Sequence, residues 1–158
     1  MESASTTNDA VSVPDTQPRD EPPRLPGSRA QEILEALPAW GDVVTIVLHG
    51  ACVFEYKGPF PPGTVGRGYY NLQGSRPGFE GHLKLDAIDH IAFQDRPHAG
   101  RIAHALTFND RDGRNIFKVF LGREDDGSIK TNQLAAYKQL QSQAAGTDQS
   151  GAIEEPGT

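Results

Sequence analysis

The middle of the chain alternates apolar and polar side chains with the period of two that is typical of a β-strand. In residues 81–86, Leu83 and Leu85 point to one side, and polar side chains occupy most of the positions between and around them. Such segments follow one another without the roughly 10–15-residue helical crossovers that parallel strands need. We therefore expect an antiparallel sheet with one face exposed to water.

About seven segments carry this pattern. The expected strands are Val43–His49, Ala51–Lys57, Tyr69–Leu72, Gly81–Asp86, His90–Asp95, His104–Asn109 and Ile116–Leu121. Only Gly50 separates the first two, so this region is either a hairpin or a bulged, bent strand. The last two are joined by a turn in which Asp112-Gly113 supplies the positive φ that a hairpin needs.

Two helices flank the strands. Ser28 is the expected N-cap of the first helix, with Gln31 completing a capping box, and Pro38 is expected to end that helix. The second helix is expected from about Thr131 to Gln141. The predicted fold class is α+β, a mainly antiparallel β-sheet with a short N-terminal helix and a C-terminal helix.

The 158-residue length is that of about one domain. Residues 1–28 are rich in proline and acid, and residues 144–158 are mostly Gly, Ser, Thr, Gln and acid, so both are expected to be disordered tails unless a partner orders them. The folded domain is expected over residues 29–143.

Charge and composition exclude several classes of protein. Residues 1–28 contain five acidic and two basic residues, and residues 144–158 contain three acidic residues and no basic one. The segment 29–143 therefore has thirteen acidic and thirteen basic residues, and we expect no basic surface for nucleic acid. No apolar stretch approaches the roughly 18–20 residues that span a bilayer, and no secretory signal is visible, which favours a cytoplasmic protein without membrane association. A single cysteine excludes a disulfide scaffold, and Cys52, within an apolar run, is expected to be buried.

The motifs of dinucleotide-binding, P-loop, zinc-protease and serine-hydrolase enzymes are missing from the sequence. The chemically versatile side chains are five histidines: His49, His82, His90, His98 and His104. None are spaced at i, i+2 or i, i+4, so no single element chelates a metal. For any one histidine, a solvated or structural role is the alternative.

His82 stands out by its neighbours. It begins a strand on the polar face, after the loop 74–78, and aromatic or basic side chains surround it in sequence: Tyr69, Tyr70, Arg67, Arg76 and Lys84. An imidazole, a flat apolar contact and cations for two propionates are what a porphyrin needs. In the alternative reading, one tyrosine belongs to the core and the other to the surface.

Ordered sequence blocks carry a family resemblance. The blocks are Ala39–Gly50, Val53–Gly58, Gly68–Leu72, Gly78–Leu83, His90–Phe93, Arg96-Pro97 with Gly100-Arg101, and Phe117–Arg123. In order and spacing they resemble the HutX/ChuX-type intracellular haem-utilisation carriers over about residues 30–141.

The resemblance implies a saddle-like antiparallel sheet, a homodimer, and b-type haem bound without a covalent link, as cargo for a haem-degrading partner. The family's Gly-His-(Leu/Ile) histidine corresponds to His82, the first candidate for the axial iron ligand, with Tyr69 or Tyr70 second. Arg67 stands where some members have a histidine and is a candidate propionate partner, as is Lys84.

His98 occupies a loop position where members often have an aromatic residue, and it is kept as a further haem-binding candidate. The expected function is therefore a haem carrier in iron acquisition, and not an enzyme. Two alternatives stay open: a haem-degrading oxygenase on the same scaffold, and a haem-independent interaction module.

Overall fold

The computed structural model describes residues 21–74 and 78–147. The strands are β1 (Arg24–Pro26), β2 (Asp42–His49), β3 (Cys52–Pro59), β4 (Gly63–Gly66), β5 (Tyr69–Gln73), β6 (Glu80–Lys84), β7 (His90–His98), β8 (Arg101–Asn109) and β9 (Asn115–Phe120). The helices are α1 (Ala30–Ala36) and α2 (Thr131–Thr147), with 3-10 turns η1 (Gly27–Arg29), η2 (Leu37–Trp40) and η3 (Leu85–Ala87). The α+β class is confirmed.

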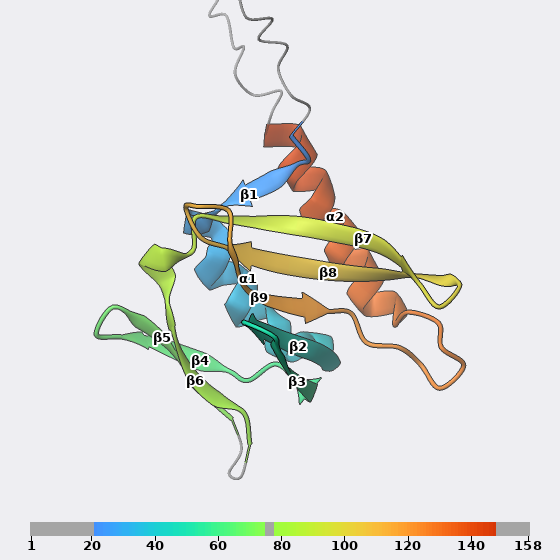
Figure 1. Ribbon diagram of the computed structural model, residues 1–158, viewed down its shortest axis with the longest axis horizontal. Helices are drawn as coiled ribbons and strands as arrows, with labels where there is room; N and C mark the ends of the chain where they lie inside the picture. Colours follow the sequence, from blue (N-terminus) through green and yellow to red (C-terminus); the bar gives the residue numbers. More distant parts are fainter. Residues whose placement is uncertain (1–20, 75–77, 148–158) are drawn as a thin grey trace, which may run out of the picture.

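The strands form two sheets, and every pairing in them is antiparallel. One sheet has six strands in the order β1-β7-β8-β9-β2-β3, and the other has three in the order β4-β5-β6. In Figure 1, α1 and α2 lie behind the six-stranded sheet, and the three-stranded sheet extends from its lower left. One face of the large sheet is therefore covered by helices.

The core lies between the large sheet, the helices and the inner face of the small sheet. Phe117 on β9 stacks on Phe108 of β8 with ring centroids 4.3 Å apart, and on Phe60 at 6.5 Å. Phe60 begins the segment that leads into the small sheet, which contributes Tyr70 and Leu72 to the same cluster. This apolar contact fixes the small sheet against the large one.

The two runs around Gly50 form a hairpin, and not a bent strand. His49 pairs with Cys52, and Gly50 has a φ of 58°, a value that favours glycine at the first central position of a two-residue turn. Cys52 is exposed, so the expectation of a buried thiol was wrong. The apolar run that contains it lies on the outermost strand of the sheet, and no other described strand pairs with the outer edge of that strand.

The N-terminal boundary of the fold also differs from the expectation. Leu25, in the segment predicted to be a disordered tail, is 1% exposed and pairs with Ile91, because β1 adds to the edge of β7. Residues 1–20 and 148–158, the remainder of the two predicted tails, lie outside the described residues. The last helix continues beyond the predicted Gln141, because Ala144 packs into the core at 1% exposure.

The predicted capping box is absent as well. The first α-helix begins after Arg29, with no side-chain cap, because residues 27–29 already form a 3-10 turn. A short β4 was not predicted, since the glycines at both of its ends resemble loop sequence.

Candidate functional site

The strand register of the small sheet brings several of the predicted site residues onto one face. Tyr69 pairs with Lys84, and Asn71 pairs with His82. Because alternate residues of a strand share a face, these four side chains lie on the outer surface, and Tyr70 points to the opposite side. The rings of Tyr69 and His82 meet edge to face with centroids 6.4 Å apart.

His82 is oriented by Asn71. The distance from His82 Nδ1 to Asn71 Oδ1 is 2.6 Å, and the Asn71 amide nitrogen donates to the backbone oxygens of Thr64 and Gly66. Because the amide nitrogen has those acceptors, its oxygen is the atom that faces the histidine. The imidazole therefore donates from Nδ1, and its Nε2 is left as a lone-pair donor at an exposed position.

Arg67 lies at the tip of the β4–β5 hairpin. Gly66 pairs with Tyr69, and the two residues between them, Arg67 and Gly68, have φ values of 56° and 80°. Two consecutive positive φ values are those of a type I′ turn. Arg67 and Lys84 are exposed and both lie at the Tyr69 end of the small sheet, so two cations are placed near the predicted ligand.

Tyr70 is separated from this group. It is 1% exposed and belongs to the core, and burial together with the charge of Glu35 raises the pKa of its phenol. Arg76, which the sequence placed near His82, lies outside the described residues. Of the two adjacent tyrosines, one is therefore in the core and the other on the surface, as the alternative reading had it.

The hollow beside His82 has a mostly polar lining. It is bounded by Asn71, Leu72, Gln73, Gly74, Glu80 and His82. Leu72 is the one apolar side chain among these. This part of the small sheet therefore offers an accessible ligand atom but little apolar surface.

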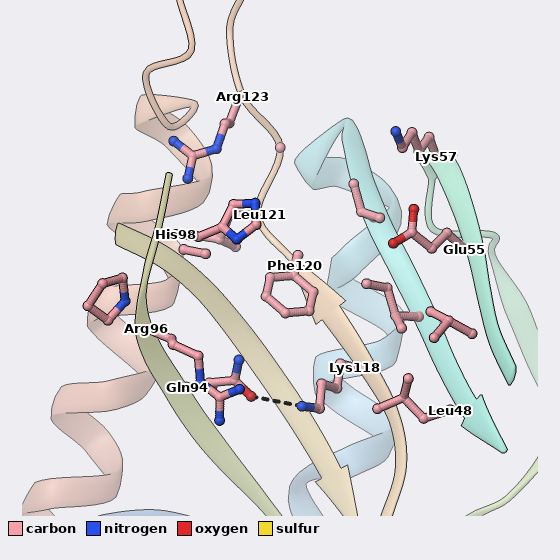
Figure 2. A pocket seen from close by; sticks show the side chains of 16 residues that line it. Leu48, Glu55, Lys57, Gln94, Arg96, His98, Lys118, Phe120, Leu121 and Arg123 are labelled. Carbon is pink, nitrogen blue, oxygen red and sulfur yellow. Dashed lines mark hydrogen bonds between the residues drawn. The ribbon is translucent and has the colours of Figure 1, made fainter. Parts of the chain in front are cut away.

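A larger apolar surface lies on the face of the six-stranded sheet turned away from the helices (Figure 2). It is a groove of about 610 Å³, of a size that suits a small-molecule ligand. Its apolar lining includes Val44, Ile46, Leu48, Val53, Ala103 and Phe120, and its polar lining Glu55, Lys57, Gln94, Arg96, His98, Lys118 and Arg123. His98 therefore belongs to this groove, on a different sheet from His82.

Cations dominate the polar lining of the groove. Lys118 donates to Gln94 at 2.9 Å, and both desolvation and the nearby charge of Arg96 lower the pKa of its ammonium. Among the described residues, neither Lys118 nor Arg96 forms an ion pair with a carboxylate. A groove with both apolar side chains and cations is suited to a ligand that has an apolar body and carries carboxylates.

The sequence analysis missed this groove. Its walls come from β2, β3, β7, β8 and β9, and only the strand order brings these strands together. The available signal was the spacing of Val44, Ile46 and Leu48, which predicts a shared face but does not say which strands flank it.

A second polar cluster joins α2 to the sheet. Asp95 accepts hydrogen bonds from His104 at 2.6 Å, from Tyr137 at 2.8 Å and from Gln141 at 3.0 Å. Burial would raise the pKa of Asp95, but these hydrogen bonds outweigh it and hold the pKa below its usual value. Since Tyr137 is fully buried, this cluster is a structural tie that holds the last helix in place.

Two further properties bear on the kind of site. In the part of the chain that the structure describes, no group of three or more His, Cys, Asp or Glu side chains is placed to hold a metal ion. Among the same residues, no helix has the length and hydropathy needed to cross a membrane.

Comparison with known proteins assigns the chain to a family. The model of a family described as haem utilisation ChuX/HutX matches residues 23–140. The chain belongs to the ChuX/HutX family. The resemblance inferred from the sequence blocks is thereby confirmed, and the matched residues include both the small sheet and the groove.

Several known proteins are similar to the chain in sequence or in structure. The chain is 46% identical over 117 residues, 74% of its length, to the intracellular heme transport protein HutX of Vibrio cholerae, and spans 61% of that relative. A structure of the heme binding protein ChuX has 30% identity and a TM-score of 0.69 over 76% of this chain and 75% of that one. A protein from Agrobacterium tumefaciens has 31% identity and a TM-score of 0.71, over 77% and 70%.

Proposed function

We propose that the protein binds haem and carries it to a partner that degrades or uses it, as part of haem-iron utilisation. Membership of the ChuX/HutX family supports this, as does the name of the Vibrio cholerae relative, an intracellular heme transport protein. The chain spans about three fifths of that relative, so the activity is a proposal for this chain. We further propose that it acts in the cytoplasm.

The observation that carries the proposal is the hydrogen bond between Asn71 and His82. It directs the proton to Nδ1 and leaves Nε2 to coordinate iron, the arrangement that metal-bound histidines generally have. We propose His82 as the axial ligand of a b-type haem held without a covalent link. Tyr69 is the second candidate, since its ring lies next to that of His82.

The two haem propionates would need cations. Arg67 and Lys84 are the candidates at the small sheet, because they lie at the Tyr69 end of the same surface. The groove offers Arg96 and Lys118 instead, together with His98 and more apolar surface. We propose the His82 surface as the place where iron is coordinated and the groove as the alternative place, with His98 as its ligand.

Coordination by one exposed side chain suits a carrier. A carrier has to hold haem firmly enough to suppress free haem and still release it to an acceptor. His82 lies at the surface, so an acceptor can approach the iron without local unfolding. We propose that the acceptor is a haem-degrading protein, and that the carrier works as a homodimer, which light scattering on a sizing column would test.

A haemin titration tests the proposal. We expect a saturable Soret band in the wild type at about one haem per chain, and a shifted or lost band in His82→Ala but not in His90→Ala. His90 is a matched control, because its Nδ1 faces Asp89 on a different sheet. A band lost in His98→Ala and retained in His82→Ala would move the iron to the groove. No saturable band in the wild type would refute the carrier function.

The oxygenase alternative predicts a different result. Aerobic incubation of the haem complex with ascorbate, with hydrogen peroxide scavenged, would give a biliverdin-like product if the protein were an oxygenase. We expect the porphyrin band to persist, because the proposed role is transport.

A further inference from the structure

We propose that the groove on the open face of the six-stranded sheet binds a fatty acid, with the carboxylate between Arg96 and Lys118 and the alkyl chain along β2. This site is separate from the His82 surface, where the proposed function places the haem iron. The inference goes beyond haem, and it requires that haem does not occupy the groove, which is the alternative position in the proposed function.

Two cations come together in the middle of the groove. Arg96 is on β7 and Lys118 is on β9, and Figure 2 shows the Lys118 side chain extending across β8 toward Gln94 and Arg96. The Lys118 ammonium donates to Gln94 Oε1 at 2.9 Å, and among the described residues neither cation forms an ion pair with a carboxylate. Two like charges held close together are suited to bind one anionic group between them.

Small side chains leave room for that group above β8. On this face of the sheet, Ala103 lies opposite Arg96, and Ala105 lies opposite Gln94. Because β8 lies between β7 and β9, only these methyl groups separate the two banks of the groove here, and Lys118 reaches across them. A carboxylate can therefore lie over β8 within reach of both cations.

Lys118 gains the most from an anion at this place. Its side chain is half-buried, and burial together with the charge of Arg96 holds the pKa of its ammonium below the usual value. A carboxylate between the two cations would counteract both effects, because it attracts the ammonium and accepts hydrogen bonds from it. Binding of the carboxylate should therefore raise the pKa of Lys118.

The large apolar side chains of the groove gather on the opposite side, over β2 and its neighbours. Phe120 lies opposite Val44, and Leu48 lies opposite Val53, with Ile46 between these two pairs along β2. All five line the groove, and Leu48 and Val53 are 45% and 57% exposed. A ligand that covers them would bury apolar surface, so the groove favours a molecule with one anionic end and one apolar end.

The shape of this apolar surface favours a chain. Val44, Ile46 and Leu48 follow one another on one face of β2 and form an apolar strip about 13 Å long. Ile46 lies opposite Lys118 on one neighbouring strand and opposite Glu55 on the other, so charged side chains flank the strip on both sides. Since strands are about 4.8 Å apart, the strip is about one strand wide at this point. An alkyl chain fits such a strip, whereas a flat macrocycle needs apolar surface in two directions.

Calorimetric titration of the full chain with laurate, below its micelle concentration, tests the site. We expect one laurate per chain, and about tenfold weaker binding in Lys118→Met and in Arg96→Met, because each variant loses one charge-assisted contact. Lys138→Met, on the exposed side of α2, is the matched control and should bind laurate as the wild type does. No saturable binding, or equal affinity in all four proteins, would overturn the inference.

The chemistry of the ligand provides a second test. Dodecyltrimethylammonium has the same chain with a cationic head, and acetate has the same head without the chain. We expect neither to bind at the concentrations at which laurate saturates the site. Ile46→Asn, in the middle of the apolar strip, should weaken laurate binding severalfold. Binding of the cationic amphiphile as tight as that of laurate would overturn the inference.

The Lys118 side chain reports the position of the head group. We expect the Cε signal of Lys118, assigned in a carbon NMR spectrum by its loss in Lys118→Met, to titrate at higher pH with laurate than without it. A titration that laurate does not change would overturn the placement of the carboxylate.

Haemin distinguishes this inference from the proposed function. Laurate should bind equally well to His82→Ala and to wild-type protein loaded with one equivalent of haemin. Displacement of laurate by that haemin would overturn the inference and move haem to the groove, with the carrier function still standing. Saturable laurate binding in a protein without a saturable Soret band would support the groove site and refute the carrier function.

Discussion

Asn71 and His82 are opposite one another on neighbouring strands of the small sheet, and the carboxamide oxygen of Asn71 accepts the Nδ1 proton of His82 at 2.6 Å. Asn71 is held by its own hydrogen bonds to the β4 backbone, so the pair is fixed from two sides. An exposed imidazole is thereby given one tautomer and one orientation. This is the arrangement that a metal-ligating histidine needs before the metal arrives.

If His82 coordinates the haem iron as proposed, replacing Asn71 should weaken haem binding without removing the ligand. Asn71→Leu leaves Nδ1 without its acceptor, and we expect affinity for haemin to fall by about 10–100-fold, the usual effect of losing such a partner. Asn71→Asp keeps an acceptor and should retain most of the affinity. Nitrogen NMR of the imidazole would report the tautomer directly. Equal affinities in wild type and Asn71→Leu would mean that His82 is not the iron ligand.

Much of the local structure could be predicted from the sequence. The two-residue period placed Leu83 and His82 on opposite faces, and the Asp112-Gly113 pair was expected in the turn between β8 and β9, where Gly113 has a φ of 78°. These predictions succeed because each depends on the nearest neighbours along the chain.

Features that depend on strand order could not be predicted. The groove exists because β9 lies between β8 and β2, and no local pattern encodes that order. Leu25 was assigned to a disordered segment, since one apolar residue among prolines is uninformative until the edge of β7 gives it a place. For the same reason, the sequence could not show that His98 and His82 lie on different sheets.

Removing the Asp95 carboxylate should destabilise the fold. In Asp95→Ala, the hydroxyl of the fully buried Tyr137 loses its acceptor at 2.8 Å and is left with the Gln94 backbone oxygen at 3.4 Å, so we expect a cost of about 1–3 kcal/mol in the free energy of unfolding. Urea denaturation would measure it. Tyr137→Phe is the control, because it removes the donor together with its need for a partner. Tyr137→Phe should lower the free energy of unfolding less in the Asp95→Ala background than in the wild type.

Asp95 should also make stability depend on pH in the acid range. Its pKa in the folded protein is held below the unfolded value of about 3.9. The stabilisation is therefore fully present above about pH 4 and is lost as the pH falls through the lower folded value. Urea denaturation between pH 2 and 5 should show that the free energy of unfolding falls less steeply with decreasing pH in Asp95→Asn than in the wild type. Identical pH profiles would show that the carboxylate gains nothing from its three donors.

Gln133 should be one of the strongest single contributors to the position of α2. It is fully buried, accepts from the Gly122 backbone at 2.7 Å, and donates to the backbone oxygens of Trp40 and Asp42. Gln133→Leu removes all three hydrogen bonds and leaves the Gly122 amide and the Asp42 oxygen without this partner, while the Trp40 oxygen keeps Asn132, and we expect a loss of about 3 kcal/mol. The neighbouring Asn132→Ala should cost less, because that side chain makes a single hydrogen bond, to Trp40.

Arg67→Gly should distinguish the effect of the Arg67 charge on haemin binding from the effect of its backbone conformation on stability. Arg67 has a φ of 56° in a type I′ turn, where glycine fits without strain and a side chain does not. We expect Arg67→Gly to keep or raise the melting temperature, and Arg67→Ala to leave it near that of the wild type, because alanine keeps the strain. If Arg67 binds a propionate, both variants should weaken haemin binding equally, by about tenfold for one charge-assisted contact. Unchanged affinity in both would assign the propionates to Lys84 or to the groove, since the turn itself is preserved in Arg67→Gly.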